Sequence, residues 1–151
     1  MKRLIGSTCA VLACVLLPAS SFAGVSNMEL RSFSSGKSAI DAPLCDTLTG
    51  CTLPDPMDPT QNQPAISFDL DMDRTVHIEG DVYAAPDCQG DFQTAMGDLA
   101  LPGGHDIVYL NFQPPLPAGT QLSIDWRAGS APVCDTGCVN YTIGTDPALC
   151  Q

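Results

Sequence analysis

Residues 66–73 carry the pattern that decides the fold: Ile66-Ser67-Phe68-Asp69-Leu70-Asp71-Met72-Asp73 alternates apolar and polar side chains without a break. Successive side chains of a β-strand point to opposite faces, so this period of two predicts a strand with one buried face and one solvated face. The same parity continues through Val76, Ile78 and Val82. Either one long bent strand or a hairpin with a three-residue turn at 73–75 keeps that parity, whereas a two-residue turn would put Val76 on the wrong face.

Further strands are predicted downstream. Residues 107–112 form an apolar run between glycine and proline pairs, which is typical of a strand buried on both faces or nearly so. Residues 120–126 alternate again and place Trp126 with the inward side chains, so we expect Trp126 in the core. A last short strand is expected at 139–143, and 92–96 leave room for only a short one between Gly90 and Gly97.

The fold class follows from these strands and from the composition. The 151 residues include 13 Gly and 13 Pro, which disfavour a helical bundle because both residue types destabilise helix interiors. About five to seven short strands, with turn signals roughly every 8 to 12 residues, predict an all-β fold. We expect a small antiparallel β-sandwich or barrel, with immunoglobulin-like spacing of strands and turns, stapled by disulfides.

The first 23 residues have the features of an export signal. Lys2 and Arg3 precede an apolar run at 4–17, and Ser21-Phe22-Ala23 fits the small-x-small rule for cleavage. The apolar run is shorter than the roughly 20 residues of a membrane span, and no later stretch is as long. We therefore expect a secreted or periplasmic protein, cleaved near Ala23, with no membrane span.

Cysteine usage supports an oxidising compartment. Cys9 and Cys14 would leave with the signal, and the six that remain are an even number: Cys45, Cys51, Cys88, Cys134, Cys138 and Cys150. Six cysteines in a small exported chain are best explained by three disulfides, and their 15 possible pairings cannot be separated by sequence alone. Joining near neighbours would pair Cys45 with Cys51, Cys134 with Cys138, and Cys88 with Cys150.

The mature chain is expected to have two parts. Residues 24–64 contain a Ser-rich stretch and four prolines at 54, 56, 59 and 64, so we predict an irregular N-terminal segment there. Residues 65–151 are predicted to form the single β-sandwich domain.

A cluster of carboxylates is the most suggestive candidate site. On one strand face we expect the side chains of Asp69, Asp71, Asp73, Glu79 and Asp81. Calcium takes six to eight oxygen ligands, so this face is a candidate calcium site. The helix-loop-helix calcium motif fails, because Arg74 and Gly80 occupy its glycine and glutamate positions. A solvated acidic face that keeps the sheet soluble is the alternative explanation.

The two histidines and the catalytic motifs are weaker candidates for a functional site than the carboxylates. His77 and His105 each have an acidic neighbour in sequence and could serve copper or zinc, but surface residues without a special role are the simpler expectation. Gly36-Lys37-Ser38 lacks the first glycine of a phosphate-binding loop. Ser34 and Lys37 have the spacing of penicillin-binding enzymes without the partner motifs. The sequence therefore predicts no cofactor and does not predict an enzyme.

Charge narrows the class of partner. The chain has 17 acidic and 6 basic residues and a formal net charge of −11, which argues against nucleic acid because phosphate backbones are bound mainly by Lys and Arg. We predict an exported binding, inhibitory or structural protein that meets an extracellular or periplasmic macromolecule, with a basic partner favoured. The alternative function is a periplasmic metal-binding protein that uses the Asp69–Asp81 face.

Overall fold

The computed structural model describes residues 25, 27–54, 62–129, 132–144 and 149–150. The predicted export signal lies outside these residues. The described residues form eight strands, one short α-helix and one 3₁₀ turn, in chain order: β1 (Asn27–Ser34), α1 (Leu44–Thr47), β2 (Thr49–Pro54), β3 (Asn62–Leu70), β4 (Arg74–Tyr83), η1 (Pro86–Cys88), β5 (Phe92–Leu101), β6 (Gly104–Gln113), β7 (Gln121–Ala128) and β8 (Cys134–Thr142). The chain is therefore nearly all β, as predicted.

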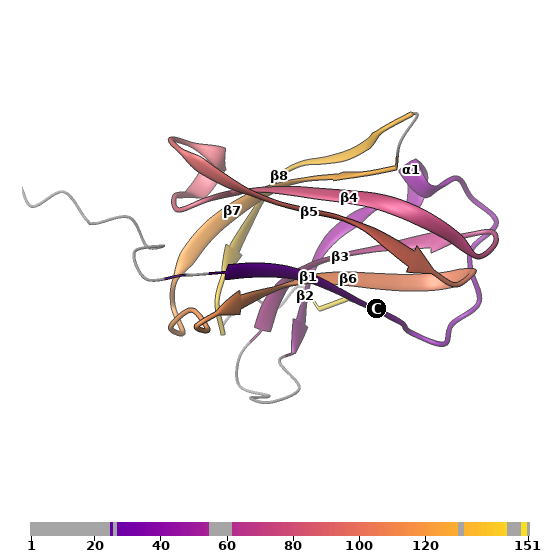
Figure 1. Ribbon diagram of the computed structural model, residues 1–151, viewed down its shortest axis with the longest axis horizontal. Coiled ribbons are helices and arrows are strands. Elements are labelled where there is room, and N and C mark those ends of the chain that lie inside the picture. Colours follow the sequence, from indigo (N-terminus) through magenta and orange to yellow (C-terminus); the bar gives the residue numbers. More distant parts are fainter. Residues whose placement is uncertain (1–24, 26, 55–61, 130–131, 145–148, 151) are drawn as a thin grey trace, which may run out of the picture.

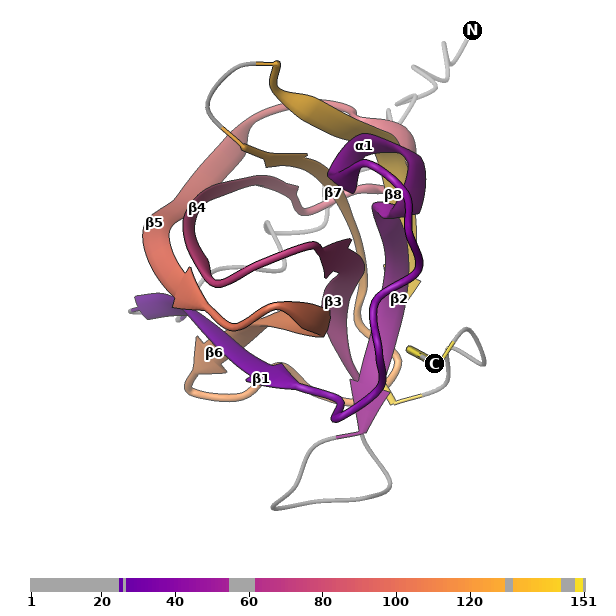
Figure 2. The ribbon, with the colours of Figure 1, turned by 90° about the vertical axis from the view of Figure 1, so that its right-hand side faces the viewer.

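The strands form two antiparallel four-stranded sheets. Sheet A has the order β1-β6-β3-β2, and sheet B has the order β5-β4-β7-β8. Figures 1 and 2 show the two sheets enclosing a common interior, with α1 beside the strands at one end. The architecture is the disulfide-stabilised β-sandwich expected from the sequence.

The core lies between the sheets and takes the side chains that the alternation marked as inward. Phe68 of β3, Ile78 of β4 and Trp126 of β7 are completely buried. Trp126 Nε1 donates a hydrogen bond to Tyr141 Oη at 2.9 Å, and that hydroxyl donates to the Ala65 carbonyl at 3.0 Å. Because Trp126 and Tyr141 belong to sheet B and Ala65 to sheet A, this buried pair of bonds joins the two sheets.

The link between β3 and β4 differs from both predicted arrangements. The two strands belong to different sheets, and residues 71–73 carry the chain from one to the other. The parity is nevertheless kept: Leu70 and Val76 both face the interior and are 1% and 2% exposed. A crossing between sheets and a hairpin satisfy the same alternation, so the hydrophobic pattern could not distinguish them.

The outer face of β3 also differs, because it is buried rather than solvated. Ser67 and Asp69 are 7% and 2% exposed. The segment before β2 covers this face, since the Ile40 amide donates to Asp69 Oδ2 at 3.0 Å and the Asp69 amide donates to Thr47 Oγ1 at 2.9 Å. Alternation in the sequence shows which face of a strand is polar, but not what covers it. Here the polar groups of Asp69 form hydrogen bonds with protein groups instead of water.

The predicted irregular segment 24–64 also contains regular structure. β1 pairs with β6 along its whole length, and β2 pairs with β3. β1 is an edge strand in which only alternate side chains such as Met28 and Leu30 are partly buried, so its polar composition hid it. Pro64 lies inside β3, at a position that pairs with Thr52 of β2 and precedes the first pair with β6. The other prolines at 56 and 59 lie outside the described residues.

All six expected cysteines form disulfides, but the pairing by near neighbours is wrong. The bonds are Cys45–Cys134, Cys51–Cys150 and Cys88–Cys138, with sequence separations of 89, 99 and 50 residues. Each joins parts of the chain that folding brings together: α1 to β8, β2 to the C-terminal residues, and η1 to β8. The predicted turn at 134–138 is instead part of β8, which carries an irregular register there.

Candidate functional site

The five carboxylates predicted to share one face are divided between the two sheets. Asp69 lies on the outer face of sheet A, Asp71 and Asp73 lie in the crossing, and Glu79 and Asp81 lie on β4 of sheet B. Asp71 forms an ion pair with Arg74, and Asp73 Oδ1 accepts a hydrogen bond from the Gly103 amide at 2.8 Å. Within the part of the chain that the structure describes, no three His, Cys, Asp or Glu side chains are grouped so as to hold a metal ion. The calcium hypothesis stays a prediction, without the common face that suggested it.

Glu79 and Asp81 belong to a different set of carboxylates, created by strand register. On β5, Asp98 is the cross-strand partner of His77, which lies two residues before Glu79 on the same face of β4. On β7, Asp125 is the cross-strand partner of Asp81. Asp135 of β8 pairs with Arg127, which is itself opposite Glu79. We call this outer surface of sheet B the acidic face; its carboxylates are Glu79, Asp81, Asp98, Asp125 and Asp135. Sequence analysis could not assemble it, because each strand contributes only one or two of them.

Arg127 is the cation at the centre of the acidic face. Its guanidinium contacts Glu79 Oε1 at 2.9 Å and also contacts Asp81 Oδ2. Asp81 is 6% exposed and accepts a further bond from Thr94 Oγ1 at 2.5 Å, so it is held inside the face. Asp98 and Asp135 are exposed, and they present charge to solvent.

Asp125 shows how crowded the carboxylates are. Burial raises the pKa of Asp125, and the nearby charges of Asp135 and Asp81 raise it further, against the opposing effect of Arg127. A carboxyl whose ionised form is disfavoured by like charges gains from a nearby cation. The like charges gathered on the acidic face therefore disfavour ionisation of Asp125.

Apolar side chains border the acidic face along β5. Tyr83 and Phe92 are cross-strand neighbours with ring centroids 5.2 Å apart, and Phe92 is 52% exposed. Met96, opposite Glu79, is 61% exposed. β5 is also the edge strand of sheet B. Aromatic and methionine side chains are enriched at protein interfaces.

The two histidines occupy different settings. His77 lies on β4 at one end of the acidic face, where Nδ1 is 2.7 Å from Asp98 Oδ1 and the side chain is 40% exposed. His105 lies on β6, and its side chain is only 16% exposed. The expectation of a plain surface residue is wrong for His105, because the loop before β2 covers it.

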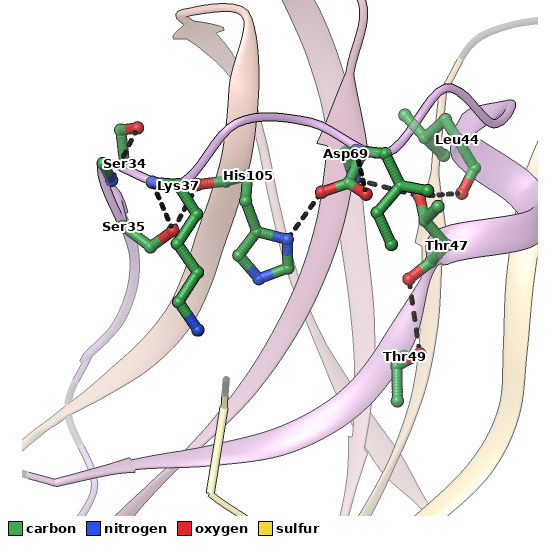
Figure 3. Close-up of polar contacts among 10 residues, drawn as sticks. Ser34, Ser35, Lys37, Leu44, Thr47, Thr49, Asp69 and His105 are labelled. Atoms are coloured by element: carbon green, nitrogen blue, oxygen red, sulfur yellow. Dashed lines mark hydrogen bonds and ion pairs between the residues drawn. The ribbon is translucent and has the colours of Figure 1, made fainter.

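His105 is fixed by Asp69 rather than by its sequence neighbour Asp106. His105 Nδ1 is 2.6 Å from Asp69 Oδ1, while the other carboxylate oxygen accepts the Ile40 amide. Figure 3 shows the ring with Asp69 on one side and Lys37 on the other. His105 Nε2 is buried and has no hydrogen-bond partner among the described residues.

A cavity of about 690 Å³ adjoins this pair on the outer face of sheet A, and we call it the His105 cavity. Loop residues 37–40, the start of β2 and the disulfide-bonded C-terminal residues surround it. Among the residues that line it are Lys37, Ile40, Asp46, Asp69, His105 and Leu149. Its size is that of small-molecule sites.

Asp106 points the opposite way from His105, into the core. It is 0% exposed, and neither carboxyl oxygen has a hydrogen-bond partner among the described residues. Burial raises the pKa of Asp106 to about 6; the charge of His105 opposes the shift and that of Asp69 adds to it. A buried carboxyl without a partner is costly when ionised, so this residue is a source of pH-dependent stability.

Comparison with known proteins assigns no family. No family model matches the sequence, and neither a curated protein nor a solved structure matches it significantly. None of the helices in the described residues has the length and apolar character required to cross a membrane. The fold and the three disulfides define the class of protein: a small disulfide-stabilised β-sandwich.

Proposed function

We propose that this chain is an exported binding protein whose acidic face holds a basic macromolecular partner of the periplasm or the extracellular medium. The observation that carries the proposal is the register of sheet B, which places five carboxylates around the single guanidinium of Arg127. Complementary charge accelerates encounter and selects partners of opposite sign.

We expect the partner to contact the apolar side chains that border the acidic face as well as its charges. Phe92 and Met96 are exposed beside the carboxylates, on β5, an edge strand of sheet B. Desolvated aromatic contacts provide most of the affinity at interfaces, while charges at the rim mainly set specificity and association rate. We therefore expect Phe92 to anchor the partner and the acidic face to select it.

Export is part of the same proposal. Three disulfides within a chain of this size fit an oxidising compartment, because the cytosol keeps thiols reduced. Inhibition and a structural role would use the same scaffold, and the identity of the partner distinguishes them: an enzyme for an inhibitor, an envelope component for a structural protein.

The test compares two isosteric double variants of the protein, immobilised and exposed to the native envelope fraction. Asp98→Asn with Asp135→Asn removes two exposed charges from the acidic face, and Glu29→Gln with Asp41→Asn removes two exposed charges elsewhere. We expect wild type and the second variant to retain the same basic protein, released by salt, and the first variant to bind it roughly three- to tenfold more weakly.

Two results would contradict the proposal. One is a partner retained equally by the face variant, and the other is a partner whose binding does not change with ionic strength. Phe92→Ala is the complementary variant, since it should weaken binding without changing the salt dependence.

A further inference from the structure

We propose that the His105 cavity is a binding site for a small organic carboxylate with an apolar body, separate from the acidic face and independent of the partner proposed there. The proposal rests on two groups that line one cavity: the ammonium of Lys37, which forms no ion pair among the described residues, and His105 Nε2, which has no hydrogen-bond partner there.

Lys37 is the first of these groups. Among the described residues, the cations Arg31, Arg74 and Arg127 each form an ion pair with a carboxylate, and Lys37 forms none. Its backbone is fixed, because the Lys37 carbonyl accepts the His105 amide at 3.2 Å and its amide donates to Ser35 Oγ at 3.3 Å. These two hydrogen bonds hold the backbone of Lys37, and its exposed side chain lies beside the His105 ring (Figure 3).

His105 is the second group. Asp69 engages Nδ1, so the ring is oriented and the remaining nitrogen, Nε2, faces away from the carboxylate without a partner among the described residues. In the imidazolium form both ring nitrogens donate, and Nε2 is then a donor for an anion. Nε2 is buried, so binding requires a neighbouring flexible side chain to move aside.

The charges that oppose an anion here are few. Asp69 is satisfied by His105 and by the Ile40 amide, and Asp106 projects from the opposite face of β6 into the core. Asp46 lines the cavity from α1, so the head group is expected at the Lys37 end. A carboxylate placed there accepts hydrogen bonds from both Lys37 Nζ and His105 Nε2.

Part of the cavity wall is apolar, and for this reason we expect the ligand to have an apolar body. Ile40, Leu149 and the Cys51–Cys150 disulfide contribute apolar wall. Small-molecule sites combine such walls with a few convergent polar groups. A second cavity, between α1 and the start of β4, offers no comparable site, since its cation Arg74 is already paired with Asp71.

Hexanoate is a suitable probe, with hexanamide as its uncharged analogue and inorganic phosphate as an anion without an apolar body. Binding is followed by NMR of the His105 ring. We expect saturable shifts with hexanoate, with hexanamide and phosphate each at least about tenfold weaker.

Lys37→Gln is the decisive variant, because this exposed substitution should leave the fold intact. It is expected to weaken hexanoate binding about fivefold, whereas the control Arg31→Gln, on the outer face of the same sheet, is expected to leave it unchanged. His105→Gln should abolish binding. The proposal is overturned if hexanoate does not saturate, if hexanamide or phosphate binds as well, or if Lys37→Gln binds like wild type.

Discussion

At the scale of single residues, the carboxyl of Asp106 lies in the core and makes the free energy of unfolding depend on pH. Its carboxyl is 0% exposed and unpartnered within the described residues, and burial raises its pKa to about 6. The folded state therefore holds the proton more tightly than the unfolded state, whose value is near 3.8. The stability that protonated Asp106 provides is complete below pH 3.8 and is lost as pH rises through about 6.

Asp106→Asn is expected to remove this dependence. Between pH 4.5 and pH 7.5, wild type should lose about 2 kcal/mol more unfolding free energy than the variant, because an amide side chain at this position cannot ionise. Urea unfolding at the two pH values measures the difference. Asp91→Asn, at an exposed position, is the control and should show wild-type behaviour. Parallel pH profiles for wild type and Asp106→Asn would contradict the assignment.

The hydroxyl of Tyr141 is the other residue-scale feature with a measurable cost. It accepts from Trp126 Nε1 and donates to the Ala65 carbonyl across the interior. Tyr141→Phe leaves buried polar groups unpaired, so we expect a loss of about 1–3 kcal/mol in urea unfolding. Tyr83→Phe, on the outer face of sheet B, is the matched control and should cost much less. Equal losses would mean that the bonds between the sheets contribute nothing.

At the scale of elements, the sequence pattern predicts the strands in the middle of each sheet well and the strands at the sheet edges poorly. β3 and β7 were expected because their apolar side chains recur at every second position, and β6 because residues 107–112 form a continuous apolar run. β1 was missed because it buries few side chains, and β5 was expected to end before Gly97, whereas it continues through Gly97 to Leu101. The pairing partner, which the sequence does not name, decides whether such weakly patterned segments become strands.

Two glycines on neighbouring strands test this packing. A Cβ at Gly80 of β4 would lie 3.0 Å from two ring carbons of the fully buried Trp126, whereas at Gly97 of β5 the nearest atom would be Leu30 Cδ1 at 3.9 Å. We expect Gly80→Ala to destabilise the protein by about 1–3 kcal/mol through overpacking. Gly97→Ala should be neutral or slightly stabilising, because alanine restricts the unfolded chain. Chemical unfolding of both variants checks this, and a tolerated Gly80→Ala would contradict the close contact of β4 with β7.

At the scale of the whole molecule, the candidate sites and the disulfide pairing could not be predicted for one reason. Both depend on which strands become neighbours, over 50 to 99 residues for the disulfides and over 36 residues for Asp69 and His105. Asp98, Asp125 and Asp135 are unremarkable in sequence and gather only through the order β5-β4-β7-β8. In the same way, Asp69 reaches His105 only because β3 lies beside β6. What the sequence did predict is local: strand parity, burial of Trp126 and the use of the six cysteines.

The observed pairing makes each disulfide a long-range constraint. Near-neighbour pairs at 45–51 and 134–138 would have closed short loops, whereas the actual bonds span 89, 99 and 50 residues. The entropy removed from the unfolded chain grows only with the logarithm of loop length, so the three bonds should stabilise the fold by similar amounts, about 4–5 kcal/mol at most. Removing any one pair is then expected to cost roughly 2–5 kcal/mol.

The double variants Cys88→Ser with Cys138→Ser and Cys45→Ser with Cys134→Ser test this expectation by denaturant unfolding of the oxidised proteins. If loop entropy dominates, the two losses agree within about 1 kcal/mol, although one loop is much longer than the other. Wild type treated with reductant is the control and should be less stable than either variant, because it lacks all three bonds. An unfolding transition that reductant leaves unchanged would mean that the hydrophobic core suffices alone, and the argument from cysteine usage to an oxidising compartment would lose its physical basis.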